Sequence, residues 1–385
     1  MNGVNDVYII GGLRSYIGLK GGIYRHVPAE ILGAQVCRAL LDKYKISTAD
    51  CIICGNGVGA GGNITRLMAL EAGLDCSVPA FSVDMQCCSG LESVVCAAEK
   101  IACGHADMII AGGFESSSTQ PRRAYNANHP AYNSDDDSTN FYDTAKFTPG
   151  EQRETAMLEG AEYTAQKYGV SAAEMDAWVL KSHARALAAR NEHLLDEIIA
   201  PVCGASKDEG IRPRMSQRLL DRMPKLLPGG KLLTAANSCL INDGAAMLFL
   251  CSEKYLKQYG LTPMAKIKAA AACGTDPLTS PLGAVTVTQK ILRQNNLSAA
   301  DVDAFELNEA FAVIDVLFDR AFPGCKDKYN VFGGALAYGH PYGASGAVIL
   351  LHLLASLQKS GGRLGCCSIA GAGGLGSSLL VERMV

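Results

Sequence analysis

One pattern of small residues and apolar runs occurs twice, once in each half of the chain. In the first half the pattern comprises the elbow 87–90, a helix ending near Cys103-Gly104, a strand at 108–110 and Gly112-Gly113. In the second half it comprises the elbow 343–346, an apolar helix of about 347–358, Gly361-Gly362, a strand around 366–369 and Gly373-Gly374. Because the order of elements is the same, the sequence predicts a duplicated fold whose elbows meet near a pseudo-twofold axis.

Glycines lie where strand-like runs meet helix-like runs, which is typical of α/β proteins. The chain has 385 residues, 48% hydrophobic and 19% charged, so it can bury a large core. Its middle third is less regular and is interpreted as an insertion. We expect a first half at 1–116, with about 241–262 returning to it, a loop or cap domain at 117–240 and a second half at 263–385.

Charge and cysteine content exclude several classes of function. The formal net charge is -3 and basic runs are absent from the sequence, so we expect no nucleic-acid partner. Apolar segments approaching the ~18 residues of a membrane span are also absent, so we expect no membrane partner. Fifteen cysteines favour free thiols in the reducing cytoplasm. Cys51 and Cys54 form a C-x-x-C pair on a predicted strand, where residues three apart face opposite sides, and we expect core residues and no metal.

Cys87 has the setting of a nucleophile. A strand-like run at 80–83 precedes it, and a helix is predicted over about 91–103. Unpaired N–H groups and the helix dipole favour a thiolate at a helix N-terminus. The alternative is a buried structural cysteine, which describes most cysteines.

Three later segments carry further candidate residues. Leu307–Ala312 follows a predicted strand at 304–306 and is expected to begin a helix. The glycine-lined loop 333–343 holds His340 between Gly339 and Pro341, two residues that restrict its position. The loop 370–376 is rich in glycine, so its backbone can approach a ligand closely.

Together these segments resemble the thiolase family over nearly the whole chain. The motifs that carry the resemblance are Cys-x-Ser-Gly-Leu at 87–91, Thr-Ala-Ala-Asn at 234–237, Ile-Asn-Asp-Gly at 241–244, Asn-Glu-Ala-Phe-Ala at 308–312 and Gly-His-Pro-x-Gly-Ala-Ser-Gly at 339–346. The resemblance implies a five-layered α/β/α/β/α fold of two similar halves with an inserted loop domain.

The resemblance also implies a division of catalytic roles. Cys87 would accept an acyl group from an acyl-CoA as a thioester, and His340 would accept its proton. His340 and a water held by Asn308 would stabilise the thioester oxygen. The backbone N–H groups of Cys87 and Ala372 would form a second oxyanion pocket.

Substrate contacts are implied at four further positions. Arg212 falls where the family places an arginine against the CoA adenine, although an ordinary exposed arginine is an equal alternative. Cys239 replaces a serine that contacts pantetheine. Phe311 and Met157 would line the acyl and pantetheine end, although such residues are usually core. Coenzyme A thioesters would be substrates, no other cofactor is expected, and the family usually forms homodimers or homotetramers.

One departure from the family pattern affects the expected activity. The second reactive cysteine of thiolases falls at Ala370, and the position that supplies it in sterol-carrier-type thiolases is Ala310. Removing a general acid–base costs ~10²–10⁴-fold in the step it serves, unless Cys88, Cys366 or Cys367 takes its place. Three functions therefore stay open: an acetyl-CoA C-acetyltransferase, an enzyme that passes the acyl group to another acceptor or to water, and a non-catalytic CoA-binding subunit.

Overall fold

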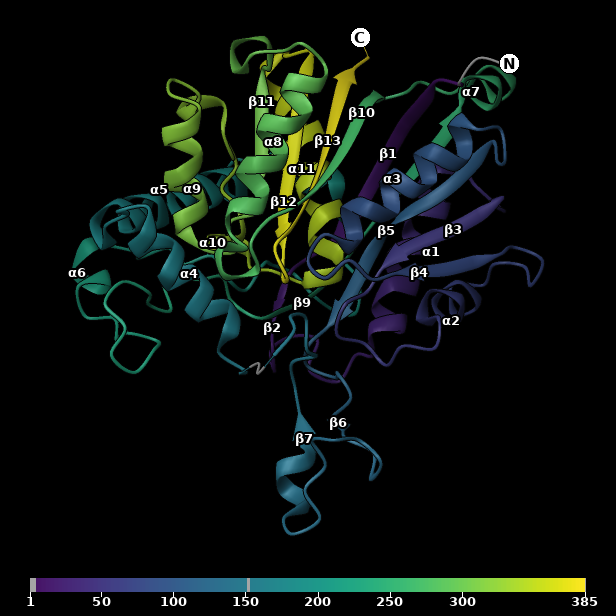
Figure 1. Ribbon diagram of the computed structural model, residues 1–385. Helices are drawn as coiled ribbons and strands as arrows, with labels where there is room; N and C mark the ends of the chain where they lie inside the picture. Colours follow the sequence, from purple (N-terminus) through teal and green to yellow (C-terminus); the bar gives the residue numbers. More distant parts are fainter. Residues whose placement is uncertain (1–4, 151–152, 385) are drawn as a thin grey trace.

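The computed structural model describes residues 5–150 and 153–384. Each half of the chain builds strands with helices on both faces (Figure 1). The strands of the first half are β1 (Val7–Ser15), β2 (Gly18–Leu19), β3 (Cys51–Gly55), β4 (Ala80–Val83), β5 (Met108–Ser116) and β9 (Asn242–Ser252). Its helices are α1 (Ala29–Tyr44), α2 (Ile64–Glu71), α3 (Ser89–Ala102) and α7 (Glu253–Tyr259).

The second half and the middle segment supply the remaining elements. The strands of the second half are β10 (Ala265–Gly274), β11 (Ala304–Leu307), β12 (Leu364–Gly371) and β13 (Leu375–Arg383). Its helices are α8 (Leu282–Gln294), α9 (Ala312–Ala321), α10 (Ala335–Tyr338) and α11 (Tyr342–Ser360). The middle segment contains β6 (Arg123–Ala124), β7 (Phe141–Tyr142), α4 (Ala156–Lys167), α5 (Ala172–Asn191), β8 (Ile199–Ala200) and α6 (Gln217–Leu220). Short 3₁₀ helices lie at Asp137–Asn140, Asp196–Ile198, Pro277–Thr279, Ala299–Asp301 and Lys326–Lys328.

Strand order confirms the duplication predicted from the sequence. The first half has the order β1-β9-β5-β3, and the second has the order β10-β13-β12-β11. In both, the first two pairings are antiparallel and the third is parallel. β4 extends the first half beyond β3. β1 also pairs with β10 at Tyr8↔Lys266 and Ile9↔Ala265, which joins the two half-sheets into one.

Helices cover the half-sheets in layers. α1 packs on the outer face of the first half, and α8 packs on the outer face of the second. α3 and α11 lie between the halves, since α11 contacts β5 and β9 on one side and β11 and β12 on the other. Three apolar clusters fill the two outer layers and the central one. In the described part of the chain the layers therefore follow the predicted order α/β/α/β/α.

Glycines allow the two central helices to meet at their N-terminal ends. A Cβ added to Gly90 would lie 2.6 Å from the carbonyl oxygen of Gly343, and one added to Gly346 would lie 2.2 Å from the nitrogen of Leu91. Side chains at these positions would push the helices apart. This close contact brings the two elbows together, as the repeated pattern predicted.

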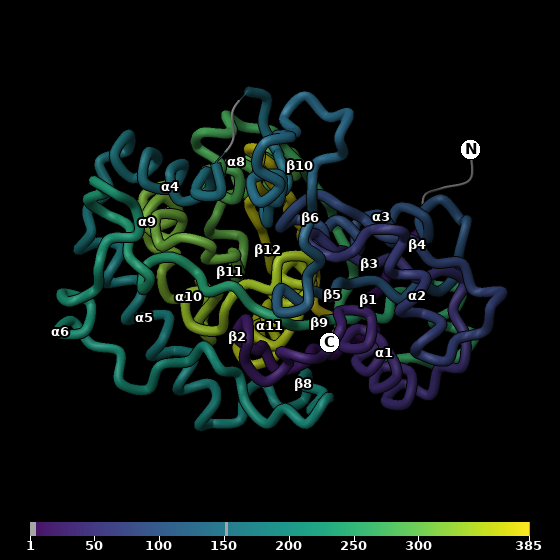
Figure 2. The backbone as a smooth tube through the Cα atoms, turned by 90° about the horizontal axis from the view of Figure 1, so that it is seen from below, coloured from purple at the N-terminus to yellow at the C-terminus, as the bar shows by residue number. Residues whose placement is uncertain are grey.

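The middle segment packs mainly on the second half. α5 contacts α9 and α10, and α4 contacts α9. The β6–β7 hairpin projects away from the layered body in Figure 1, and Figure 2 shows the same segment from below. Within the described residues, helices long and apolar enough to cross a membrane are absent. The predicted domain limits and the role of this segment as a cap stay predictions.

Candidate active site

Cys87 lies in a sharp turn between β4 and α3. The preceding residue, Gln86, has a φ of 55°, which few residues with a side chain adopt. Side chains hold the turn. Asp84 Oδ1 accepts the Gln86 N–H at 3.0 Å, and Ser89 Oγ accepts the Met85 N–H at 2.8 Å while donating to the Gln86 carbonyl at 2.5 Å. The elbow predicted from the sequence is therefore a strained turn that fixes Cys87.

The expectation of a thiolate at Cys87 is wrong for the free protein. α3 begins at Ser89, so Cys87 precedes the helix rather than capping it. Burial raises the pKa of the Cys87 thiol to about 12, although the N–H groups of Ala372 and of Cys87 itself act in the opposite direction. Glu115 raises it further. Desolvation therefore outweighs the helix terminus, and the thiol needs a base.

This pKa predicts how Cys87 reacts with iodoacetamide. Because only the thiolate reacts, the rate should rise about tenfold per pH unit between roughly pH 7 and 10. Mass spectrometry of the peptide that contains Cys87 measures the rate. A plateau beginning near neutral pH would show a stable thiolate and contradict the raised pKa.

His340 is a buried, neutral imidazole. Its Nδ1 lies 2.6 Å from Ser345 Oγ, and Ser345 donates to the Pro341 carbonyl at 3.1 Å. The hydrogen-bond network therefore assigns the proton to Nδ1. Nε2 is then the basic nitrogen, and it accepts a long hydrogen bond from Asn308 Nδ2 at 3.4 Å. Burial lowers the pKa of His340 to about 3, so the ring stays neutral at physiological pH.

Asn242 holds the backbone of His340 in place. Its Oδ1 accepts the His340 N–H at 2.9 Å, and its Nδ2 donates to the Gly18 carbonyl at 2.8 Å. Gly339 has a φ of 106°, and a Cβ there would lie 2.1 Å from Asn242 Oδ1. Only glycine fits beside this amide. The sequence showed Asn242 in a family motif but gave no indication of this contact.

Asn308 is held at the end of β11. Its N–H donates to the Ser368 carbonyl at 3.1 Å, and its own carbonyl accepts the Ala310 N–H at 3.0 Å. The Cys239 N–H donates to the Ala310 carbonyl at 2.9 Å. The helix expected to begin in this segment starts only at Ala312. The extended segment therefore places Cys239 beside Ala310.

The Cys239 and Cys87 thiols interact electrostatically. Burial raises the pKa of the Cys239 thiol, and Cys87 raises it further. Both thiols also raise the pKa of Tyr342, whose ring lies 5.0 Å from the His340 ring at 84°. Tyr342 thus contacts the imidazole and interacts electrostatically with both thiols.

Glu115 is a buried carboxylate beside this site that the sequence analysis missed. β5 runs through the glycine pair predicted to close it and ends at Ser116, so Glu115 lies on the strand. Its oxygens accept N–H groups of Gly57 at 2.8 Å, Val58 at 3.3 Å and Gly343 at 2.9 Å, and the Asn56 amide at 2.9 Å. Burial raises the pKa of Glu115 to about 7 despite these bonds. An acidic residue after a glycine pair on a strand was the available signal.

Glu115 should make stability depend on pH. Its pKa rises from 4.5 to about 7 on folding, so between these values the folded state binds more protons than the unfolded state. The free energy of unfolding should therefore fall by about 3 kcal/mol as pH rises through this window. Urea unfolding of Glu115→Gln should lack this component, whereas exposed Glu71→Gln should keep it. Equal pH slopes in wild type and Glu115→Gln would contradict the assignment.

The three residues predicted to contact CoA or the acyl group lie in different parts of the structure. Arg212 is exposed, and its N–H donates to His183 Nδ1 at 3.1 Å. Phe311 is buried in the core of the second half, and Met157 is half-buried at the start of α4. Among the described residues, no hydrogen bond, ion pair or ring contact joins these three to Cys87, so their roles stay predictions. Clusters of metal-ligating side chains are absent from the described residues.

The cysteines considered as substitutes for the second thiol point elsewhere. Cys88 Sγ donates to the Ile369 carbonyl at 3.4 Å, and Cys366 Sγ lies 3.5 Å from Ser378 Oγ. Cys367 is fully buried in the central apolar cluster. Burial raises the pKa of all three thiols. Their geometry therefore gives no support to the substitution.

Known proteins are similar to this chain over nearly its whole length. Models of the "Thiolase, N-terminal domain" and the "Thiolase, C-terminal domain" match residues 7–254 and 261–383. Proteins named "Putative acetyl-CoA C-acetyltransferase" are similar: VraB of Staphylococcus epidermidis (35% identity, covering 97% of this chain and 98% of the relative) and YhfS of Bacillus subtilis (34%, covering 98% and 99%).

Solved structures agree with these matches. The acetyl-CoA acetyltransferase of Bacillus anthracis superposes with a TM-score of 0.90 at 28% identity, covering 100% of both chains. Human mitochondrial 3-ketoacyl-CoA thiolase in complex with CoA gives a TM-score of 0.90 at 28% identity, covering 99% of this chain and 98% of that one. The chain belongs to the thiolase family.

Proposed function

We propose that the protein is an acyltransferase that carries an acyl group from coenzyme A as a thioester on Cys87. The simplest such activity is that of an acetyl-CoA C-acetyltransferase, which interconverts two acetyl-CoA with acetoacetyl-CoA and CoA. The observation that carries the proposal is that the strained turn at Cys87 and the loop that carries the neutral imidazole of His340 meet where Gly90 packs against Gly343. Names of the relatives support the same reaction class.

Acylation needs only groups that this site contains. Nε2 of His340 takes the proton of the Cys87 thiol while the sulfur attacks the thioester carbonyl. The carbon–sulfur bond to CoA then breaks, and the CoA sulfur receives the proton back from His340. Asn308, with a bound water, and the N–H groups of Cys87 and Ala372 would stabilise negative charge on the oxygen. The effect of the Ala372 N–H on the pKa of Cys87 supports its place beside the sulfur.

Cys239 is the best candidate for the second acid–base. Ala370 and Ala310 lack a thiol, but the Cys239 backbone is bonded to Ala310 and its thiol interacts with Cys87. Because the pKa of the Cys239 thiol is raised, it would first pass its proton to His340. The thiolate would then remove a proton from the methyl group of the second acetyl-CoA, whose carbon attacks the acyl carbonyl. The bond between that carbonyl and the Cys87 sulfur breaks, and His340 returns its proton to Cys87. The two alternatives, transfer to another acceptor or to water and mere CoA binding, do not require this thiol.

Cys239→Ala should therefore separate the two half-reactions. We expect thiolysis of acetoacetyl-CoA to fall about 10²–10⁴-fold, with acetylation of Cys87 by acetyl-CoA nearly unchanged. Cys203→Ala, which removes another half-buried thiol, is the matched control. Unchanged thiolysis in Cys239→Ala would rule out this role for Cys239.

Two parallel assays test the function as a whole. One follows incorporation of labelled acetyl-CoA into protein, and the other follows acetoacetyl-CoA thiolysis. Label on Cys87 together with thiolysis supports the C-acetyltransferase, and label alone supports the other-acceptor alternative. Acetoacetyl-CoA thiolysis by a Cys87→Ser variant would contradict the proposal. Binding of CoA by wild-type protein that takes up no label would also contradict it.

Further parts of the proposal concern binding and context. Arg212 would contact the CoA adenine, and Met157 and Phe311 would line the acyl and pantetheine end. All fifteen cysteines are free in the described residues, which supports a reducing compartment such as the cytoplasm. A homodimer or homotetramer is the assembly we propose from the family resemblance.

A further inference from the structure

A cavity outside the proposed acylation site lies beside the C-terminal end of α5. Its volume is about 180 Å³, and the proposed acyl transfer uses none of its side chains. Two buried residues, Arg14 and Tyr338, contribute to the lining. The other lining residues with polar or charged groups that matter here are Tyr16, Arg190, Ser206 and Lys207.

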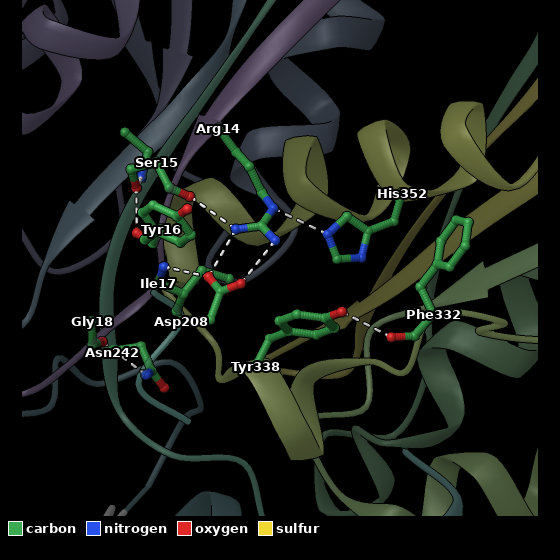
Figure 3. A network of polar contacts seen from close by, with 11 residues as sticks. Arg14, Ser15, Tyr16, Ile17, Gly18, Asp208, Asn242, Phe332, Tyr338 and His352 are labelled. Atoms are coloured by element: carbon green, nitrogen blue, oxygen red, sulfur yellow. Dashed lines mark hydrogen bonds and ion pairs between the residues drawn. The ribbon is translucent and has the colours of Figure 1, made fainter. Parts of the chain in front are cut away.

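Arg14 anchors the buried end of this cavity (Figure 3). Its Nη1 and Nη2 donate to Asp208 Oδ1 at 2.9 Å and Oδ2 at 3.1 Å. Nη1 also donates to the Ser15 carbonyl at 3.0 Å, and Nε donates to His352 Nε2 at 3.1 Å. A guanidinium has five N–H donors, so in the described part of the chain one N–H on Nη2 has no acceptor. Arg14 can therefore bind one more oxygen.

Other polar groups that line the cavity also have hydrogen-bond donors without an acceptor. Among the described residues, the side chains of Arg190 and Lys207 and the hydroxyl groups of Tyr16 and Ser206 have no hydrogen-bond or ion-pair partner. Of the two acidic lining residues, Asp208 pairs with the buried Arg14. Asp196 lies at the exposed mouth, where its Oδ2 is 2.7 Å from His193 Nδ1. Two unpaired cations therefore face a cavity with few free acceptors.

We propose that this cavity binds a small oxyanion, with its phosphate or carboxylate group between Arg190, Lys207 and the free N–H of Arg14. Charge-assisted hydrogen bonds from guanidinium and ammonium groups are the strong ones, and oxyanions supply the acceptors that these donors lack. The buried Arg14–Asp208 pair holds the inner donor rigidly, so little side-chain entropy is lost on binding.

The cavity is connected to His340 by hydrogen bonds. Tyr338 lines the cavity two residues before His340 in the chain. Asp208 Oδ1 accepts the Ile17 N–H at 2.8 Å, and the carbonyl of the following residue, Gly18, accepts a hydrogen bond from Asn242 Nδ2 at 2.8 Å. Asn242 in turn accepts the His340 N–H (Figure 3 shows Asn242 beside Gly18). Occupancy of the cavity should therefore stiffen the loop that carries His340.

Calorimetric titration of the full chain with inorganic phosphate, and separately with succinate, tests the binding. We expect saturable binding of at least one of them. Arg190→Gln and Lys207→Gln should each weaken that binding about tenfold. Arg293→Gln, which removes an exposed arginine on α8 remote from the cavity lining, should leave it unchanged. Absence of saturable binding, or equal weakening in all three variants, would overturn the site.

Competition and hydrogen exchange complete the test. If CoA displaces phosphate and dephospho-CoA does not, the ligand group is the 3′-phosphate of CoA; if neither does, it is a free oxyanion. The bound anion should also slow amide exchange in residues 333–345 of the wild type but not of Arg190→Gln. Binding without any change in exchange would refute the connection to His340. These measurements do not depend on acyl transfer, so they can fail or succeed independently of the proposed function.

Discussion

Cys87→Ser is expected to lower the rate of acyl transfer from acetyl-CoA by at least about 10⁴-fold. A serine hydroxyl is a far weaker nucleophile than a thiolate, and His340 is too weak a base in this buried site to ionise it. Single-turnover release of CoA measures the loss. The temperature of thermal unfolding should be nearly unchanged, because the substitution only replaces a sulfur atom by a smaller oxygen atom at a half-buried position.

The adjacent cysteine provides the control for this loss. Cys88→Ala removes a fully buried thiol bonded to the Ile369 carbonyl, so it should lower stability by about 1 kcal/mol. Acyl transfer should nevertheless continue. If Cys87→Ser keeps the wild-type rate of acyl transfer, or if only Cys88→Ala loses it, the nucleophile is a residue other than Cys87.

His340→Gln is the substitution with the second largest expected effect. Glutamine keeps a polar group near Asn308 but cannot accept the thiol proton, so acylation should slow about 10²–10⁴-fold. The dependence of the rate on acetyl-CoA concentration distinguishes a change in the maximal rate from a change in the apparent affinity for acetyl-CoA. The maximal rate should fall, and the apparent affinity should change little, because the imidazole acts on the proton rather than on CoA.

Ser345→Ala tests how His340 is oriented. The substitution removes the acceptor of the Nδ1 proton, which fixes the tautomer with a basic Nε2. We expect a smaller loss than in His340→Gln, about tenfold, since the ring itself remains. A loss in Ser345→Ala that exceeds the loss in His340→Gln would contradict the role of His340 as the base.

Local pattern predicted much of the fold because strands and helices follow from short-range periodicity. The predicted strand at 80–83 matches β4 (Ala80–Val83), and the predicted helix of about 347–358 lies within α11 (Tyr342–Ser360). The duplication was also readable, since each half repeats its glycines in order. Element ends were less accurate. The glycine pair at 112–113 was expected to follow the strand, but β5 continues through it. Gly113 is needed within the strand because its backbone packs closely against Gly343.

Long-range contacts explain what the sequence could not predict in the site. Cys87, Asn308 and His340 stand in recognisable local settings. Glu115 and Asn242 act through partners that lie in other elements, so no local pattern indicates their contacts. The charge state of Cys87 was mispredicted for a related reason. The helix dipole is a local property, whereas burial depends on how the two halves close around the thiol.

Peptide mass spectrometry of the wild type after a brief reaction with acetyl-CoA tests the central claim most directly. We expect one acetyl group on the peptide that contains Cys87, and it should disappear when excess CoA is added because the thioester forms reversibly. Acetyl groups on other cysteines only, or an unmodified Cys87 in protein that binds CoA, would contradict it.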